Sequence, residues 1–410
     1  MKVLHPRCAG LDVHKDTVVA CARIAQIEGG ARHEVVTFGT TTRELLRLSD
    51  WLTAHGCTHV VLEATGVYWK PVWQVLEGSF ELVLVNPGHV RNVPGRKTDV
   101  NDATWLADLL AHGLVEASFV PPVAIQELRT LTRTRTQLVR ERAQHVQRLQ
   151  RTLETANVKL ASVLSDIVGQ SGRAMLKALI AGETDPEVLA ALGHHRLRSL
   201  QAERVEALRG RVTPHHQFLL KLHLDQVESL ERTLAELEAE IERAFEPFRR
   251  PFEHLQTIPG VRHVVARIVL AEIGTDMSRF PTVGHLISWA GLCPRNDESA
   301  GKRRSTRVRP ATPWLKVALI QAAWSAVRME NTYLRAQFLR IRSRRGSRKA
   351  VVAVAASILT AAYHILRDDV DYRDLGPDHF DRRERAHRTK HLVRRLRDLG
   401  YEVTLRDAAA

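Results

Sequence analysis

The feature that most constrains the fold is a change of hydrophobic period near residue 120. Before it, short β-type runs at residues 9–13, 17–24, 59–64 and 81–85 alternate with helical patterns over 42–55 and 99–112. Pro121 and Pro122 then interrupt the chain, and from Ile125 to about Glu246 apolar residues recur every three or four positions. The 410 residues therefore predict an α/β domain followed by helical regions, with two to three domains in all.

The clearest helical stretch carries a heptad-like apolar seam. Such a seam packs on another helix, because its apolar side would otherwise face water. Leucines at 128, 131, 138, 149 and 153 mark a candidate partner helix. An intramolecular hairpin and an intermolecular coiled coil both remain open. The seam consists of Leu220, Leu224, Val227, Leu230, Leu234, Leu237 and Ile241.

The rest of the chain sets the expected domain borders and compartment. Gly and Pro turns extend from Pro251 to Pro313, and helical spacing returns after them. We expect domains at 1–122, 123–250 and 251–380, followed by a basic tail at 381–410. Residues 350–366 predict a buried Ala-rich helix, since they are short and polar for a membrane span. The N-terminus lacks a signal peptide, and the four cysteines form no C-x-x-C pair. We therefore expect free thiols, a cytoplasmic protein and no membrane partner.

Positive charge is concentrated in two stretches. Lys and Arg outnumber Asp and Glu by 60 to 46, which gives a net charge of +14. Residues 295–349 hold fifteen basic residues against three acids, and residues 129–151 hold seven arginines against one acid. Two such runs in one protein favour contacts to nucleic-acid phosphates over a merely solvated helix face. The predicted contacts are Arg129, Arg133, Arg140, Lys302, Arg303, Arg304 and Arg307.

Four acids form a candidate metal site. Asp12 and Glu63 close apolar runs, where a carboxylate is unfavourable unless it meets water, a partner or a metal. Asp99 and Asp102 are three residues apart, so on a helix they share one face. If these elements meet at one edge of a sheet, the acids suit two divalent ions in phosphodiester chemistry, with Mg²⁺ preferred. Taken singly, Asp99 also fits a helix cap and Asp12 a turn.

Two sets of motifs stand at opposite ends of the chain. The first set is Leu-Asp-Val-His-Lys-Asp, Leu-Glu-Ala-Thr-Gly and Lys-Thr-Asp-x-x-Asp-Ala-x-x-Leu-Ala. The second set is Ile-Pro-Gly-Val, Phe-Pro-Thr-Val-Gly, Ala-Gly-Leu-Cys-Pro and Glu-Ser-Ala-Gly-Lys-Arg. Together they resemble the insertion-sequence-110 (IS110) family of transposases, the first set its N-terminal DEDD domain and the second its C-terminal transposase domain. The resemblance covers most of residues 8–370, in the family's order. One departure is that residues 309–313 replace the Gly-Asn pair that commonly precedes Pro-Trp-Leu.

The resemblance implies a fold and a chemistry. It implies a ribonuclease H-like N-terminal domain, similar to Holliday-junction resolvases, ahead of a helical coiled-coil middle and a mainly helical C-terminal domain. The family's metal-binding acids fall on Asp12, Glu63, Asp99 and Asp102, and its nucleophilic serine falls on Ser299. It also implies a non-coding bridge RNA that pairs with donor and target DNA.

Three classes of function therefore stay open. The first is an RNA-guided recombinase in which Ser299 attacks DNA with Mg²⁺ help and leaves a phosphoserine link. Because strand exchange needs several active sites, we expect this form to be a homo-oligomer, a dimer or a tetramer. The second is a hydrolytic junction resolvase or nuclease that uses the acids alone, and the third is a basic nucleic-acid-binding protein without catalysis. The third leaves the acids unexplained, and the second leaves the C-terminal motifs unexplained.

Overall fold

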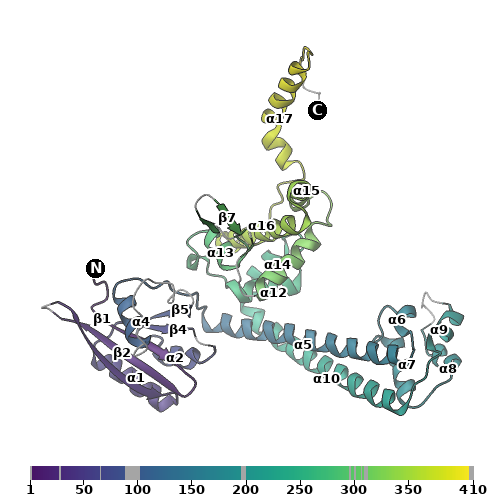
Figure 1. The fold of residues 1–410 in the computed structure, drawn as a ribbon, viewed down its shortest axis with the longest axis horizontal. Coiled ribbons are helices and arrows are strands. Elements are labelled where there is room, and N and C mark those ends of the chain that lie inside the picture. The colour runs from purple at the N-terminus through teal and green to yellow at the C-terminus, as the bar shows by residue number, and fades with distance from the viewer. Residues whose placement is uncertain are drawn as a thin grey trace. The chain divides into compact units, whose positions relative to one another are not determined.

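The computed structural model describes residues 2–26, 29–64, 66–87, 102–194, 200–294, 297–299, 302–305, 307–308 and 313–405. For residues 297–299, 302–304, 381 and 383–388 it describes the backbone only. The chain divides into two compact units, Met1–Val120 and Pro121–Ala410. Each unit is described separately below (Figure 1).

The first unit is built on a mixed five-stranded sheet. Its strands are β1 (Arg7–Val13), β2 (Thr17–Ala25), β3 (Ala31–Gly39), β4 (His59–Glu63) and β5 (Glu81–Val85), in the spatial order β3-β2-β1-β4-β5. The pairs β1/β2 and β2/β3 are antiparallel, and the pairs β1/β4 and β4/β5 are parallel. The expected α/β domain is confirmed, and its first two strands form an antiparallel hairpin.

Helices cover both faces of this sheet (Figure 1). The helices α1 (Thr42–Ala54) and α2 (Trp69–Leu76) bury leucines and a valine against one face, together with Leu11 and Leu62. The helix α4 (Asp102–Ala111) covers the other face, where Leu106 and Leu110 pack on Cys8 and Val61. Because both faces are covered, the central strands β1 and β4 are buried along most of their length.

Two elements of this unit were missed by the sequence analysis. The strand β3 has a largely exposed, polar sequence, Ala-Arg-His-Glu-Val-Val-Thr-Phe-Gly, because it lies at the edge of the sheet. An edge strand needs no continuous apolar run, so its β signal is weak. The helix α2 contains Pro71, which reads as a helix breaker but is tolerated in the first turn of a helix.

The second unit contains a long antiparallel helical hairpin. Its arms are α5 (Val123–Thr155) and α10 (Pro214–Phe245), which pack side by side (Figure 1). The seam residues Leu220, Leu224, Val227 and Ile241 are buried, as are Leu128 and Leu149 on α5. The structure therefore shows an intramolecular hairpin, in which the remaining seam residues Leu230, Leu234 and Leu237 are half-buried. Self-association through this helix stays a prediction.

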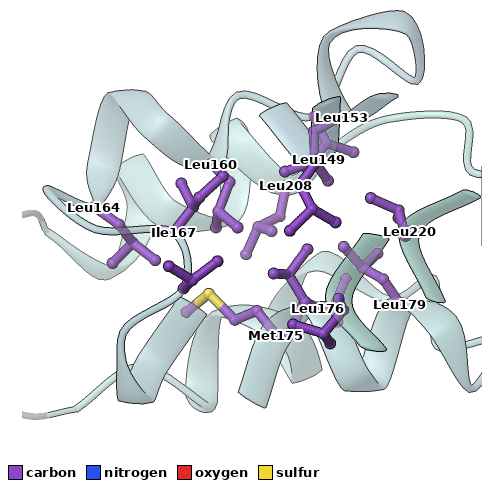
Figure 2. Packing of buried hydrophobic residues seen from close by; sticks show 14 of the residues in the cluster. Leu149, Leu153, Leu160, Leu164, Ile167, Met175, Leu176, Leu179, Leu208 and Leu220 are labelled. Atoms are coloured by element: carbon purple, nitrogen blue, oxygen red, sulfur yellow. The ribbon is translucent and has the colours of Figure 1, made fainter. Parts of the chain in front are cut away.

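Four short helices close the far end of the hairpin. They are α6 (Leu160–Val163), α7 (Gln170–Ile180), α8 (Pro186–Ala191) and α9 (Gln201–Leu208). Figure 2 shows side chains from α6, α7, α9 and both arms pointing toward one centre, with Leu176 and Leu179 near Leu220. This end of the hairpin therefore has a hydrophobic core of its own.

The remainder of the second unit is mainly helical. Its core helix α16 (Ser347–Asp368) packs against α14 (Pro313–Ala326) and α15 (Tyr333–Arg345), with further contacts to α11 (Arg249–Gln256) and α13 (Val283–Trp289). The unit also holds α12 (His263–Ile273), the short 3-10 helices η1 (Glu246–Phe248) and η2 (Met277–Arg279), and α17 (His379–Asp398). A small antiparallel pair, β6 (Asp297–Ser299) and β7 (Lys302–Ser305), was not foreseen.

The Ile-Pro-Gly-Val turn between α11 and α12 packs closely on α14. Gly260 has a φ of +82°, and a Cβ at this position would lie 2.3 Å from the carbonyl oxygen of Ala322. Only glycine satisfies both the positive φ and the close approach. The turn thus has a packing role within the unit.

The expected Ala-rich helix and free thiols are both confirmed. Within the described residues, α16 is the single helix long and apolar enough to cross a membrane, and half of that stretch is buried in the protein. Ala350, Val354 and Ile358 are among its buried residues, as expected for a core helix. Cys8, Cys21, Cys57 and Cys293 are all free, and the first three are buried.

Candidate catalytic and nucleic-acid-binding sites

Asp12 and Glu63 lie side by side at one end of the sheet. The parallel pairing of β1 and β4 places Leu11 opposite Leu62, so Asp12 and Glu63 are the next residues on neighbouring strands. Side chains alternate between the faces of a strand. Asp12 therefore shares the face of Cys8, and Glu63 that of Val61, which is the face covered by α4. Both acids are half-buried.

Asp102 comes to the same face because α4 begins there and crosses β1 closely. A Cβ on Gly10 would lie 2.1 Å from the carbonyl oxygen of Ala103, so the first turn of α4 touches the strand two residues before Asp12. Asp102 stands in that first turn and is half-buried. A carboxylate there is favoured by the helix dipole. The glycine thus allows the helix to approach at the level of the acids.

The three described acids share one face and one end of the sheet without forming a compact cluster. In the part of the chain that the structure describes, no three His, Cys, Asp or Glu side chains are grouped closely enough to hold one metal ion. Asp99, the fourth predicted acid, lies outside the described residues. Its role as a ligand stays a prediction.

His14, which was not among the predicted site residues, contacts this site. Its Nε2 lies 3.2 Å from Oδ2 of Asp12. The Asp12 side chain is 23% exposed and that of His14 is 58% exposed, so the pair is open to solvent. The only sequence signal was the position of His14 two residues after Asp12 on the same strand end.

A partly buried ion pair, which the sequence did not predict, links α4 to the sheet. Nε of Arg23 on β2 donates a 2.7 Å hydrogen bond to Oδ1 of Asp108 on α4. Nε2 of His33 on β3 lies 3.1 Å from the same oxygen. The Arg23 side chain is 6% exposed. The sequence did contain a sign of this pair, which is the arginine in the apolar run Val-Val-Ala-Cys-Ala-Arg-Ile. A buried guanidinium needs a partner of opposite charge.

Ser299 is the last residue of β6, in the second unit. Its backbone pairs with Lys302 across the β6/β7 turn, so the serine stands in a hairpin whose second strand is Lys-Arg-Arg-Ser. Arg307 follows the hairpin and is exposed. For Lys302, Arg303 and Arg304 the structure describes only the backbone.

Most arginines of the other basic stretch are occupied within the second unit. Arg133 donates two hydrogen bonds, of 2.7 and 2.8 Å, to the carboxylate of Glu272 on α12. Arg129 lies 3.7 Å from the same carboxylate and also donates to the Ala271 and Glu272 carbonyls. Burial lowers the pKa of the Arg129 guanidinium, and Glu272 opposes that shift. These two arginines therefore hold α5 on α12.

Two further arginines of this stretch bind the other arm of the hairpin. Arg142 lies 2.7 Å from Glu231, and Arg135 is paired with Glu238. The described residues provide no carboxylate partner for Arg140, Arg148 or Arg151, all of which are exposed. Contacts from Arg129, Arg133 and Arg140 to nucleic acid stay predictions, and Arg140 is the one of the three that has no intramolecular ion pair among these residues.

Two family models and one relative match this chain. Residues 9–158 match a family model described as "Transposase", whose label specifies the DEDD domain of IS110. Residues 252–339 match a model described as "Transposase IS116/IS110/IS902 family". A Streptomyces clavuligerus protein, "Insertion element IS116 uncharacterized 44.8 kDa protein", is 26% identical over 259 residues. That match covers 56% of this chain and 63% of the length of the relative.

The two family models fall on the two regions that carry the candidate residues. The first contains Asp12, Glu63 and Asp102, and the second contains Ser299 and the basic hairpin. Both models describe transposases of the same kind, in the order that the motifs predicted. The chain belongs to the IS110 family of transposases.

Proposed function

We propose that the chain cuts and rejoins DNA as the recombinase of an insertion element. The acids of the first unit and Ser299 of the second are the reacting groups. The observation that carries the proposal is the placement of Asp12, Glu63 and Asp102 on one face and at one end of a sheet. Carboxylate oxygens are the ligands that Mg²⁺ prefers, so this placement supports a cation site at this end of the sheet.

The first unit is proposed to be ribonuclease H-like and to bind Mg²⁺. The match to the DEDD domain and the strand order β3-β2-β1-β4-β5 support this. Asp12, Glu63 and Asp102, with Asp99, would hold the ion, because carboxylate oxygens are the ligands that Mg²⁺ prefers. Bound Mg²⁺ would neutralise charge on the reacting phosphate. His14 keeps the Asp12 carboxylate oriented through their 3.2 Å contact.

Ser299 is proposed to attack the DNA. Its oxygen forms a bond to phosphorus while the bond from phosphorus to one DNA oxygen breaks, and that oxygen departs as a hydroxyl after taking up a proton. The serine proton passes to a carboxylate or to water. The Lys-Arg-Arg sequence of β7 supplies cations that stabilise the phosphate charge. The resulting phosphoserine conserves the bond for rejoining.

The proposed partners are donor DNA, target DNA and a bridge RNA, acting with a homo-oligomer of this chain. Family membership supports these partners, and the net charge of +14 suits polyanions. The exposed cations for such contacts are Arg140, Arg307 and the arginines of α17 that the structure describes, Arg382 excepted because it pairs with Asp378.

The decisive experiment traps the covalent intermediate. A DNA substrate whose rejoining partner is missing should accumulate a protein–DNA species on denaturing gels, and Ser299→Ala should abolish it. Ser305→Ala is the matched control, because Ser305 lies in the same hairpin and its Oγ accepts a 3.2 Å hydrogen bond from the Arg307 backbone. That variant should keep the adduct. Cleavage by the wild type without any adduct would favour a hydrolytic nuclease instead.

The metal proposal has a separate test. Asp12→Asn should weaken Mn²⁺ binding, measured by calorimetry or electron paramagnetic resonance, and should abolish cleavage while nucleic-acid binding persists. Asp16→Asn is the control, because Asp16 lies beyond the end of β1 and is exposed. Unchanged Mn²⁺ binding in Asp12→Asn would refute the assignment of Asp12.

A further inference from the structure

A pocket in the second unit lies between three helices, and neither the predicted acids nor Ser299 line it. It encloses about 260 Å³ and is formed by α5, α12 and α14. Trp314 on α14 and Arg133 and Arg140 on α5 line it, together with Val264 on α12. We call it the Trp314 pocket. Its polar lining includes Gln321, which can donate and accept hydrogen bonds.

Trp314 is not a core residue. Its neighbour Leu315 is fully buried, whereas Trp314 is half-exposed and faces the pocket. The Pro-Trp-Leu motif therefore contains one residue that core packing explains and one that it does not. The guanidinium carbons of Arg133 and Arg140 lie 5.7 and 5.2 Å from the centre of the indole ring. Both distances are within the range of cation–π contacts.

The two arginines differ in whether their side chains are held by an ion pair. Arg133 is fixed by its two hydrogen bonds to Glu272, whose side chain is 1% exposed. Arg140 is exposed, and the described residues give it no ion pair, so it can move from the ring toward a bound anion. The negative charge in the pocket is thus already compensated by Arg133, and Arg140 is left as a cation for a ligand.

The rim of the pocket is apolar. Val139 on α5, Val264 on α12 and Val317 on α14 are each about 40% exposed, one from each helix. Exposed β-branched residues around a half-exposed indole form a surface on which a planar, weakly polar group can stack. A nucleobase has that chemistry, and its own phosphate would lie within reach of a flexible cation.

We propose that the Trp314 pocket holds a single unstacked nucleotide of single-stranded DNA, with the base on Trp314 and the phosphate on Arg140. DNA is the chosen source because β7 ends at Ser305, only eight residues before α14 begins. The helix that carries Trp314 is therefore the next helix in the sequence after the hairpin that carries the proposed nucleophile. This inference rests on the proposed function, because strand exchange requires DNA bases that are temporarily unpaired.

Binding of single-stranded oligodeoxynucleotides to the full chain, measured by fluorescence anisotropy, tests the proposal. Trp314→Ala should weaken binding by about 5- to 150-fold, the range found for single base–aromatic stacks. Trp314→Phe should keep most of the affinity. Arg140→Ala should reduce the slope of log affinity against log salt by about 0.7, whereas Arg140→Lys should not. Trp324→Ala is the matched control, since Trp324 is an exposed tryptophan on the same helix outside the pocket.

A second measurement does not depend on variants. Oligonucleotides carrying 5-iodouracil should form a photo-crosslink that mass spectrometry maps to Trp314. Crosslinks confined to other residues, with equal affinity of the wild type and Trp314→Ala, would overturn the pocket. Tighter, Trp314-dependent binding of an RNA of the same sequence would overturn the assignment to DNA. If Trp314→Ala loses single-strand binding yet the Ser299 adduct never forms, the pocket stands and the proposed recombinase mechanism fails.

Discussion

The ion pair between Arg23 and Asp108 predicts a large, local effect of Asp108→Ala on α4. The change leaves the Arg23 guanidinium, 6% exposed, without its carboxylate. Removing one partner of a buried pair costs about 3–5 kcal/mol. The Asp108 side chain is 35% exposed, so water can partly replace it, and we expect a loss of about 2–3 kcal/mol.

Hydrogen exchange measured by mass spectrometry can locate this loss. Peptides from residues 102–111 should exchange about 30- to 150-fold faster in Asp108→Ala, while peptides from the α5–α10 hairpin remain unchanged. The Mn²⁺ affinity of the first unit should fall as well, because α4 carries Asp102. A double variant, Arg23→Met with Asp108→Leu, is the control, since an apolar pair of similar volume removes the unpaired charge.

The double variant should recover at least half of the lost stability. If α4 exchanges at the wild-type rate in Asp108→Ala, the ion pair does not hold the helix. If the double variant is as unstable as Asp108→Ala, the loss comes from packing and not from an uncompensated charge.

Three further predictions concern the remaining parts of the chain. Burial, with His145 and Arg148 nearby, lowers the pKa of His223 in the hairpin. Below about pH 6.5 the unfolded chain therefore takes up a proton at His223 more readily than the folded hairpin does, so thermal stability followed by circular dichroism should fall as the pH drops. His223→Gln should reduce this pH dependence of stability. The same pH profile in the wild type and the variant would contradict a role for His223. Burial raises the pKa of Cys8 to about 12 and that of Cys57 to about 11. Maleimide at pH 8 should therefore label Cys293 first and the other cysteines only after unfolding. Early labelling of Cys8 would show that the fold around Cys8 is wrong. Leu224→Asp should destabilise the hairpin by more than about 3 kcal/mol, because it buries an unpaired charge, whereas the exposed Leu222→Asp should change hairpin exchange little; equal exchange in the two variants would show that the seam is not packed inside the chain.

The sequence predicted the central elements of the fold because their signals are local. The strands with Asp12 and Glu63 are short apolar runs, and the long helices have clear three-and-four spacing, so both were recognised. The edge strand β3 was missed because only one side of it is buried, which leaves a mostly polar sequence. The helix α2 was missed because Pro71 reads as a helix breaker. The sequence also left open whether the seam packs on a helix of the same chain or of another chain. A heptad pattern identifies the apolar side of a helix but does not identify the helix that packs against it.

The candidate site shows the same division between local and long-range information. Asp12, Glu63 and Asp102 were each found from the sequence. The strand pairing places the first two on one face, and the close approach of α4 to Gly10 brings Asp102 to the same face. What the sequence could not provide was the contact of His14 with Asp12 or the pairing of Arg23 with Asp108. Asp108 lies 85 residues from Arg23, and an acidic residue on a helix carries no mark of such a distant partner.

The arginine stretch at residues 129–151 shows why a charge run alone is weak support for a nucleic-acid surface. Four of its seven arginines form ion pairs with glutamates on α10 or α12, so they stabilise the packing of the second unit. The glutamates lie about 90 to 140 residues away in the sequence. A count of charges within a short segment of sequence therefore does not include them. Only Arg140, Arg148 and Arg151 remain exposed without such a partner among the described residues. Electrostatic attraction from α5 must therefore come from these three cations, and Arg140 alone combines that freedom with an aromatic ring beside it.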